Sequence, residues 1–222
     1  MQRAYGLEIP QTLEEAADPA GLALVVYDMQ VGIISQLRDG AEVVQRVSEV
    51  LEAARDAGVR VVFMRHMSLP NELAGVFQLR MAMAWQKVAR AEDVRPWFLR
   101  DSAGFALMPE LAPRPSEAVF DKITMSAFEG TPLAIALRDC GVRAFAIVGV
   151  ATEIGIEPTV RHGADLGFIP IVVVDACGTG DRAAAERSVE SMRFMGDAFL
   201  TDTATFRRVL AERRRRPAVP AG

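Results

Sequence analysis

Three positions in the chain carry groups that could act together as an acid–base centre. Asp28 directly follows one apolar run, Lys122 follows a second short run, and Gly155 lies in a turn after a third. A carboxylic acid can deliver a proton, and an ammonium can hold a carboxylate. Backbone N–H groups at a helix start can bind negative charge. Each signal also fits an ordinary turn, so the prediction of a reaction centre depends on the three positions converging.

The turn at Gly155 follows an almost unbroken apolar run over residues 144–150, which predicts a strand buried on both faces. A proline is tolerated in a helix only within the first four positions, so Pro158 places the helix start near Gly155. We expect unpaired backbone N–H groups there, facing the carboxyl end of the strand, as a backbone oxyanion site. An ordinary strand-to-helix turn is the alternative.

Strands and helices alternate along the chain. Apolar runs predict five further strands, at residues 22–27, 59–64, 117–121, 169–174 and 198–201. Helices are expected over 39–57, 131–140 and 181–194, and from residue 203 onward. This alternation predicts an α/β protein with a three-layer αβα architecture and a mostly parallel, six-stranded, Rossmann-like sheet in one domain spanning 1–222. Ligands bind at the carboxyl ends of such strands, where Asp28, Lys122 and Gly155 are expected to meet.

Three segments lie outside this pattern. Residues 1–21 are polar and interrupted by proline, which predicts an N-terminal arm laid over the body. Residues 67–115 form a long irregular excursion with a methionine-rich helical piece at 79–88. Such excursions are typically lids or substrate-binding segments, although a cover over apolar surface is the alternative. Residues 213–222 form a basic tail, predicted to be solvated and not a phosphate-binding patch.

Composition excludes several classes of protein. Half of the residues are hydrophobic and the formal net charge is −4, which argues against disorder and against a nucleic-acid partner. No apolar run is long enough to span a bilayer and no signal-peptide core is present, so we expect a cytoplasmic protein without a membrane partner. Cys140 and Cys177, like His66 and His162, are too far apart in sequence to indicate a disulfide or a metal site. We therefore expect no metal and no cofactor.

Several motifs resemble the isochorismatase-like superfamily, which includes nicotinamidases, carbamoylsarcosine amidohydrolases and isochorismatases. The similar stretches are 24–30 (LVVYDMQ), Lys122 with 126–133 (SAFEGTPL), 148–152 (VGVAT) and 167–176. The resemblance spans roughly residues 20–205. It implies that Asp28 and Lys122 are catalytic. It also implies a cis Val150–Ala151 bond, which would direct the Ala151 and Gly155 amides at a shared oxyanion.

Gly155 departs from the amidases of that family, which place a cysteine nucleophile there. The isochorismatase branch has glycine at this place and hydrolyses a vinyl ether without a covalent intermediate. By that resemblance, Asp28 would protonate a carbon atom of the substrate. Lys122 would orient Asp28 and bind a substrate carboxylate. Water would then add to the resulting oxocarbenium ion.

The sequence thus predicts a cysteine-independent, isochorismatase-like hydrolase of a small organic substrate, with anionic molecules among the candidates. Two alternatives stay open: a catalytically reduced ligand-binding or scaffold member, and an amidase that uses Cys177. We expect a homo-oligomer, a dimer or larger, because apolar residues crowd 81–98 and because the family suggests it. The residues expected to bind substrate are Gln30, Arg80, Trp85 and Phe128.

Overall fold

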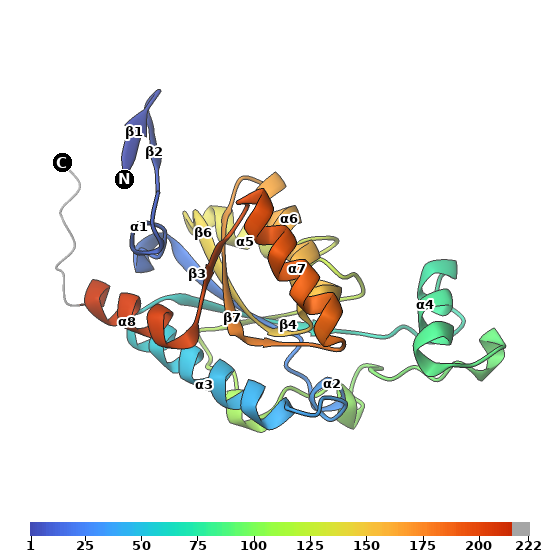
Figure 1. Cartoon of the computed structure of the whole chain (residues 1–222). Coiled ribbons are helices and arrows are strands. Elements are labelled where there is room, and N and C mark those ends of the chain that lie inside the picture. Colours follow the sequence, from blue (N-terminus) through green and yellow to red (C-terminus); the bar gives the residue numbers. More distant parts are fainter. Residues whose placement is uncertain (215–222) are drawn as a thin grey trace.

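The computed structural model describes residues 1–214, so most of the basic tail predicted at 213–222 lies outside the described residues. Six parallel strands form one sheet in the order β5-β4-β3-β6-β7-β8 (Figure 1). Their bounds are β3 (Leu22–Tyr27), β4 (Arg60–His66), β5 (Ala118–Lys122), β6 (Ala144–Val150), β7 (Ile169–Gly178) and β8 (Phe199–Thr201). The helices are α1 (Leu13–Ala16), α2 (Val31–Ile34), α3 (Gly40–Asp56), α4 (Val76–Gln86), α5 (Leu133–Asp139), α6 (Glu157–Asp165), α7 (Arg182–Met195) and α8 (Thr203–Arg214). The predicted α/β fold with six strands is confirmed.

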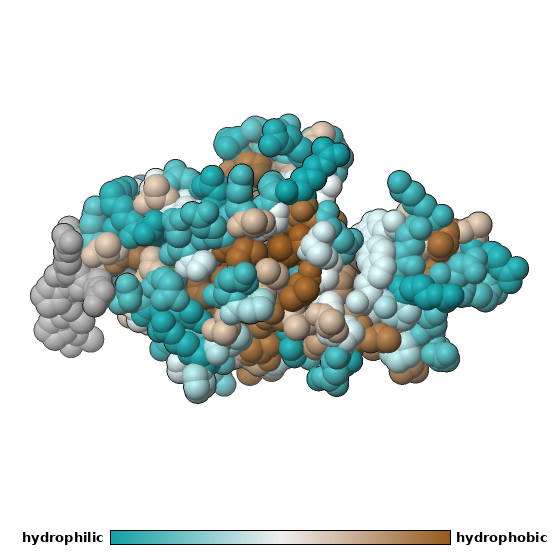
Figure 2. Space-filling model, turned by 90° about the horizontal axis from the view of Figure 1, so that it is seen from below, coloured by the Kyte–Doolittle hydropathy of each residue, from teal (hydrophilic) through white to brown (hydrophobic). Residues whose placement is uncertain are grey.

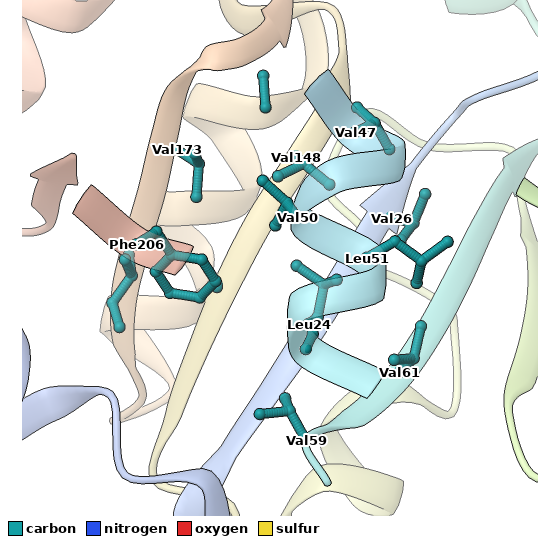
Figure 3. Packing of buried hydrophobic residues seen from close by; sticks show 14 of the residues in the cluster. Leu24, Val26, Val47, Val50, Leu51, Val59, Val61, Val148, Val173 and Phe206 are labelled. Carbon is teal, nitrogen blue, oxygen red and sulfur yellow. The ribbon is translucent and has the colours of Figure 1, made fainter. Parts of the chain in front are cut away.

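Helices cover both faces of the sheet and bury a separate core on each. Successive side chains of a strand point to opposite faces, and β3 is buried along its whole length. Leu24 and Val26 pack with α3 and with Phe206 of α8, as Figure 3 shows. Val25 and Tyr27 belong to the opposite core, under α5, α6 and α7. The sheet is therefore the middle layer of three, as the sequence predicts.

Helix α3 has the predicted apolar stripe. Its buried side chains face the sheet at helical spacing: Val43, Val44, Val47, Val50, Leu51 and Ala54. Asp39 is at the N-cap position, but its side chain makes no capping hydrogen bond. The packing of the stripe on α8 and on strands β7, β4, β3 and β6, and not the cap, holds the helix in place.

Several element boundaries differ from the prediction, by one to four residues, and two of these differences have a clear structural cause. Strand β7 continues past residue 174 to Gly178, because pairing with β6 resumes at Gly149 after a register shift. Helix α5 begins at Leu133, so Pro132 occupies the N-cap position and not the first helical position. The Thr131 hydroxyl accepts a hydrogen bond from the Leu133 N–H at 3.3 Å, so one N–H group at the helix start has a side-chain partner.

The N-terminal arm does not lie flat on the body. Strands β1 (Gln2–Ala4) and β2 (Leu7–Ile9) form an antiparallel hairpin that projects away from the sheet, at the upper left of Figure 1. Only Ala16, Ala17 and Gly21 of this segment are buried. The arm is therefore anchored at its far end, close to β3, and the hairpin itself is exposed.

Helix α4 belongs to the excursion and stands apart from the three layers (Figure 1). In the space-filling view from below, this segment forms a separate lobe at the right end of the molecule, and apolar residues are exposed on the face of the body beside it (Figure 2). No residue of α4 is buried. Among the described residues, no helix has the length and hydropathy to cross a membrane.

Truncation of a buried side chain on α3 tests this packing. Leu51→Ala should lower the free energy of unfolding by about 2–5 kcal/mol, because it removes buried methyl groups and leaves a cavity. Ile135→Ala on α5 is the control, since that side chain is mostly exposed and should change stability by about 0.5 kcal/mol or less. Urea unfolding measures both, and equal effects would contradict the described core.

Candidate active site

Asp28 and Lys122 meet at the carboxyl edge of the sheet. Asp28 follows β3 and Lys122 ends β5, on the far side of the intervening strand β4. The Lys122 Nζ donates to Asp28 Oδ2 at 2.8 Å and to the Thr124 carbonyl at 3.2 Å. Both side chains are almost fully buried, with Asp28 6 % and Lys122 3 % exposed. Two of the three predicted positions therefore form one ion pair.

Burial dominates the electrostatics of this pair. It raises the pKa of Asp28 to about 6, although the Lys122 ammonium opposes the shift. Burial likewise lowers the pKa of Lys122, and Asp28 acts against that shift. The second carboxylate oxygen, Oδ1, is buried without a hydrogen-bond partner among the described residues. An unpartnered buried oxygen is where a proton on Asp28 would be carried and offered to a substrate.

Gln30 fixes the backbone beside this pair. Its Nε2 donates to the carbonyl oxygens of His66 and Phe105, both at 3.0 Å, and its Oε1 accepts from the His66 N–H at 2.7 Å. The amide is fully buried and fully engaged by main-chain groups. The structure therefore places Gln30 as a link between β4 and the excursion. Substrate binding by Gln30 stays a prediction.

His66 connects the ion pair to a cavity. It pairs with Lys122 across β4 and β5, and its ring packs edge-on against Phe98. Burial, together with the Lys122 charge, lowers the pKa of His66 to about 3, so the imidazole is neutral at pH 7. The cavity, about 80 Å³, lies between this strand end and the excursion, and its lining includes His66, Met125, Trp85, Trp97 and Phe98. An apolar, aromatic wall with a few polar groups is typical of small-molecule sites.

The predicted substrate-binding residues are scattered. Trp85 lines the cavity. Arg80 is exposed on α4 and is absent from that lining. Phe128 is buried in the core, stacked on Phe168 at 5.5 Å and edge-on to Phe145. Their roles toward substrate stay predictions, and the structure brings only Trp85 to the described cavity.

The turn at Gly155 differs from the prediction. A π-helical turn, Thr152–Ile156, precedes α6, and the N–H groups of Ile154, Gly155 and Ile156 all donate to the Ala151 carbonyl, at 3.2, 3.0 and 3.1 Å. The expectation of unpaired N–H groups is therefore wrong, because the extra residue per turn lets one carbonyl accept all three. The Val150–Ala151 bond is cis, as the resemblance implied. The oxyanion role of Ala151 and Gly155 stays a prediction that these hydrogen bonds do not support.

Tyr27 is the site residue that sequence reasoning missed. A Cβ atom at residue 155 would lie 2.5 Å from Cε1 of Tyr27 and closer still to Cζ and Oη. The Tyr27 hydroxyl donates to the Met125 carbonyl, and the ring face lies 4.2 Å from the Lys122 Nζ. The available signal was a single aromatic residue at the end of the otherwise aliphatic run at 22–27.

Cys177 is buried in β7 and its Sγ donates to the Val173 carbonyl at 3.2 Å. Burial raises the pKa of this thiol far above its ordinary value, so it stays protonated. Cys140 is exposed. Across residues 1–214 no group of three or more His, Cys, Asp or Glu is arranged to hold a metal ion. The residues around His66 therefore do not fit a metal centre.

A parallel sheet with an acid–base pair at its carboxyl edge defines a class of α/β enzymes that act on small molecules. The isochorismatase domain profile matches residues 22–205, so the chain belongs to the isochorismatase family, and it is a hydrolase of that family. A ureidoacrylate amidohydrolase RutB from Methylorubrum extorquens is 30% identical over 185 residues, covering 79% of this chain and 74% of the relative. An isochorismatase family protein from Burkholderia thailandensis is 27% identical, with a TM-score of 0.70 over 86% of this chain and 96% of that one. A cysteine hydrolase from Pseudomonas syringae pv. phaseolicola has the same fold, with a TM-score of 0.73 at 24% identity over 89% and 96% of the two chains.

The titration of Asp28 tests the electrostatics. Carbon-13 NMR should place its midpoint near pH 6, and Lys122→Met should raise it further, because the ammonium is what lowers this pKa. The folded pKa lies above the value of 3.8 for an unperturbed carboxyl, so its contribution to stability is greatest below pH 3.8 and is lost as the pH rises through 6. Asp202 is the internal control. Its carboxylate accepts from the Thr205 N–H, so its pKa should be below 3.8. An Asp28 midpoint at or below 3.8 would contradict the described burial.

Proposed function

We propose that the protein hydrolyses a small organic substrate by acid–base catalysis through Asp28 and Lys122, without a cysteine nucleophile. One observation carries this proposal: a buried carboxyl group has one oxygen bound to an ammonium and the other without a described partner. Its pKa of about 6 leaves a useful fraction protonated near neutral pH. An acid that must donate a proton needs this combination of burial and a free oxygen.

In the proposed reaction, Asp28 transfers its proton to the substrate and becomes a carboxylate, which the Lys122 ammonium stabilises. A vinyl ether protonated at carbon gives an oxocarbenium ion, and a water molecule then adds to that cation. The added water loses one proton, which returns to Asp28, and the hemiketal that forms then collapses. Its ether C–O bond breaks, the hydroxyl proton moves to the leaving oxygen, and an alcohol and a carbonyl compound are released. The neutral His66 and the aromatic wall of the cavity would contact the rest of the substrate.

Two observations support independence from cysteine. Residue 155 has no side chain, and Tyr27 fills the space that one would need. Cys177 is buried and hydrogen-bonded to a carbonyl, and its raised pKa opposes thiolate formation. The amidase alternative keeps one argument, since relatives at about 30% identity are named ureidoacrylate amidohydrolases. Ureido and carbamoyl compounds therefore belong in any substrate panel beside vinyl ethers.

A ligand-binding or scaffold role is the second candidate. The observation that favours it is the near-complete burial of both Asp28 and Lys122, neither of which lines the described cavity beside His66. If the protein is an enzyme, substrate must reach this buried pair. We propose that the excursion at 67–115 is a lid that moves to admit it. A binding protein would show ligand-dependent stabilisation without turnover.

A hydrolase panel of vinyl ethers, amides and carbamates separates these candidates. Asp28→Asn should lower turnover by about 10²–10⁴-fold, because an amide cannot deliver the proton. The double variant Cys140→Ser/Cys177→Ser should keep turnover nearly unchanged, and Asp202→Asn is the matched carboxylate control. Activity should fall as the pH rises above 6, since the acid must be protonated. If Cys177→Ser alone abolishes turnover, the amidase alternative replaces this proposal.

We further propose that the chain assembles with a second copy through the segment that carries α4. This helix has 11 residues and none is buried, and a helix of that length is marginally stable without packing. Leu73, Val76 and Phe77 are exposed apolar side chains on this segment, at 69 %, 79 % and 62 %. Separately, we propose the cytoplasmic location that the sequence predicts.

Light scattering at micromolar concentration should report a dimer or larger species. Phe77→Glu combined with Val76→Glu should shift it to the monomer, because each change places a charge in the proposed interface. Phe194→Glu is the control: this phenylalanine is 88 % exposed but lies on α7, outside the α4 segment. A wild-type monomer, or an equal effect of the control, would refute the proposed interface.

A further inference from the structure

Tyr27 lies between the ion pair and the turn at residue 155. It is the last residue of β3, directly before Asp28, and only 1 % of its surface is exposed. Its hydroxyl donates to the carbonyl of Met125, in the loop after β5. The side chain therefore joins β3 to the loop that follows Lys122.

The ring of Tyr27 occupies the volume that any side chain at residue 155 would need. An added Cβ there would overlap the hydroxyl oxygen and two adjacent ring carbons of a side chain that is buried and hydrogen-bonded to the Met125 carbonyl. The close-packed Gly178 has different neighbours. A Cβ at Gly178 would meet Val150 and Leu37 side chains at 2.9 and 3.1 Å, and not the tyrosine. A Cβ at Gly149 would meet the backbone of Tyr27, whereas a Cβ at residue 155 would meet its ring.

The face of the same ring covers the Lys122 ammonium at 4.2 Å. The same Nζ also donates hydrogen bonds to Asp28 Oδ2 and to the Thr124 carbonyl. An aromatic face attracts a desolvated ammonium, so the ring holds it against Asp28 where water is excluded. A valine at residue 27 would keep the strand and lose both the contact and the filled volume.

We infer that Tyr27 determines the class of chemistry at this site: its ring bars a nucleophilic side chain from residue 155 and positions Lys122 on Asp28. Tyr27 is a specificity-determining and positioning residue in this inference. The inference rests on the proposed function only for the role of the ion pair in turnover. The exclusion of a side chain at residue 155 stands on packing alone and can be measured without activity.

A double-mutant cycle on thermal stability tests the exclusion. Gly155→Ala alone should lower the melting temperature by roughly 2–12 °C, as overpacking does in a domain of this size. In a Tyr27→Val background the same change should cost little or nothing, because the methyl group enters vacated space. In a Tyr27→Phe background the full loss should remain, since the ring remains. Gly178→Ala is the control and should cost the same in all three backgrounds.

A thiol placed at residue 155 reports on Lys122. In a Cys140→Ser/Cys177→Ser background, Tyr27→Val/Gly155→Cys should react rapidly with iodoacetamide, with a thiol pKa below about 8.5, because the vacated space exposes the thiol to the ammonium. Gly155→Cys without the change at residue 27 should be destabilised, and its thiol should react slowly. Turnover should survive in Tyr27→Phe and be lost in Tyr27→Val.

The outcomes separate this inference from the proposed function. If Gly155→Ala costs as much in Tyr27→Val as in the wild type, the exclusion is wrong. Equal turnover in Tyr27→Phe and Tyr27→Val would show that the ring does not position Lys122. Coupling in the stability cycle together with an active Asp28→Asn variant would leave the exclusion standing and refute the proposed chemistry. An absence of coupling together with an inactive Asp28→Asn variant would refute the exclusion and leave the proposed chemistry standing.

Discussion

The buried pair of Asp28 and Lys122 is the interaction on which the rest of the site depends. Removing two charged groups from water costs several kcal/mol for each ion, so a buried pair is weak evidence of a device for stability. The surrounding groups stabilise the charge on Lys122 more than the charge on Asp28. Lys122 has a carboxylate, a carbonyl and an aromatic face around it, whereas one oxygen of Asp28 has no described partner. This unequal stabilisation favours the protonated form of Asp28. The arrangement therefore suits proton transfer better than it suits stability of the fold.

The sheet supplies the geometry of this pair. Asp28 and Lys122 are 94 positions apart in the chain, yet they meet because β3 and β5 are parallel and end at the same edge. Strand β4 between them contributes His66, whose backbone Gln30 fixes through two hydrogen bonds. The excursion then begins directly after β4, so the cavity forms next to the ion pair. Each component of the site is thus a strand end or the segment that follows one.

The sequence predicted those parts of the site that depend on local pattern. Apolar runs located all six strands. Parallel strands bring their carboxyl ends to one edge of the sheet, so the residues at those ends lie close together whatever their side chains are. The hydrogen bonds of the N–H groups at residues 154–156 could not be predicted. A π-turn and an α-turn have the same local sequence signals but place different carbonyl groups within reach of these N–H groups. The predicted strand at 169–174 stops short of the end of β7 at Gly178, since a charged residue such as Asp175 normally marks a strand end. Asp175 stays in the strand because its carboxylate accepts from the Thr203 N–H and pairs with Arg46.

Tyr27 shows most clearly why pattern is insufficient. At the level of the strand it is one more large apolar residue, and its partners at Met125, Lys122 and Gly155 are distant in sequence. Its importance comes from a shared volume: in this structure the ring occupies the space that a side chain at residue 155 would need. A glycine at 155 therefore carries no information by itself, since it could mark a lost nucleophile or an ordinary tight turn. The buried ring that fills the space beside this glycine is the reason we propose that the carboxylic acid, and not a thiol, is the group that reacts.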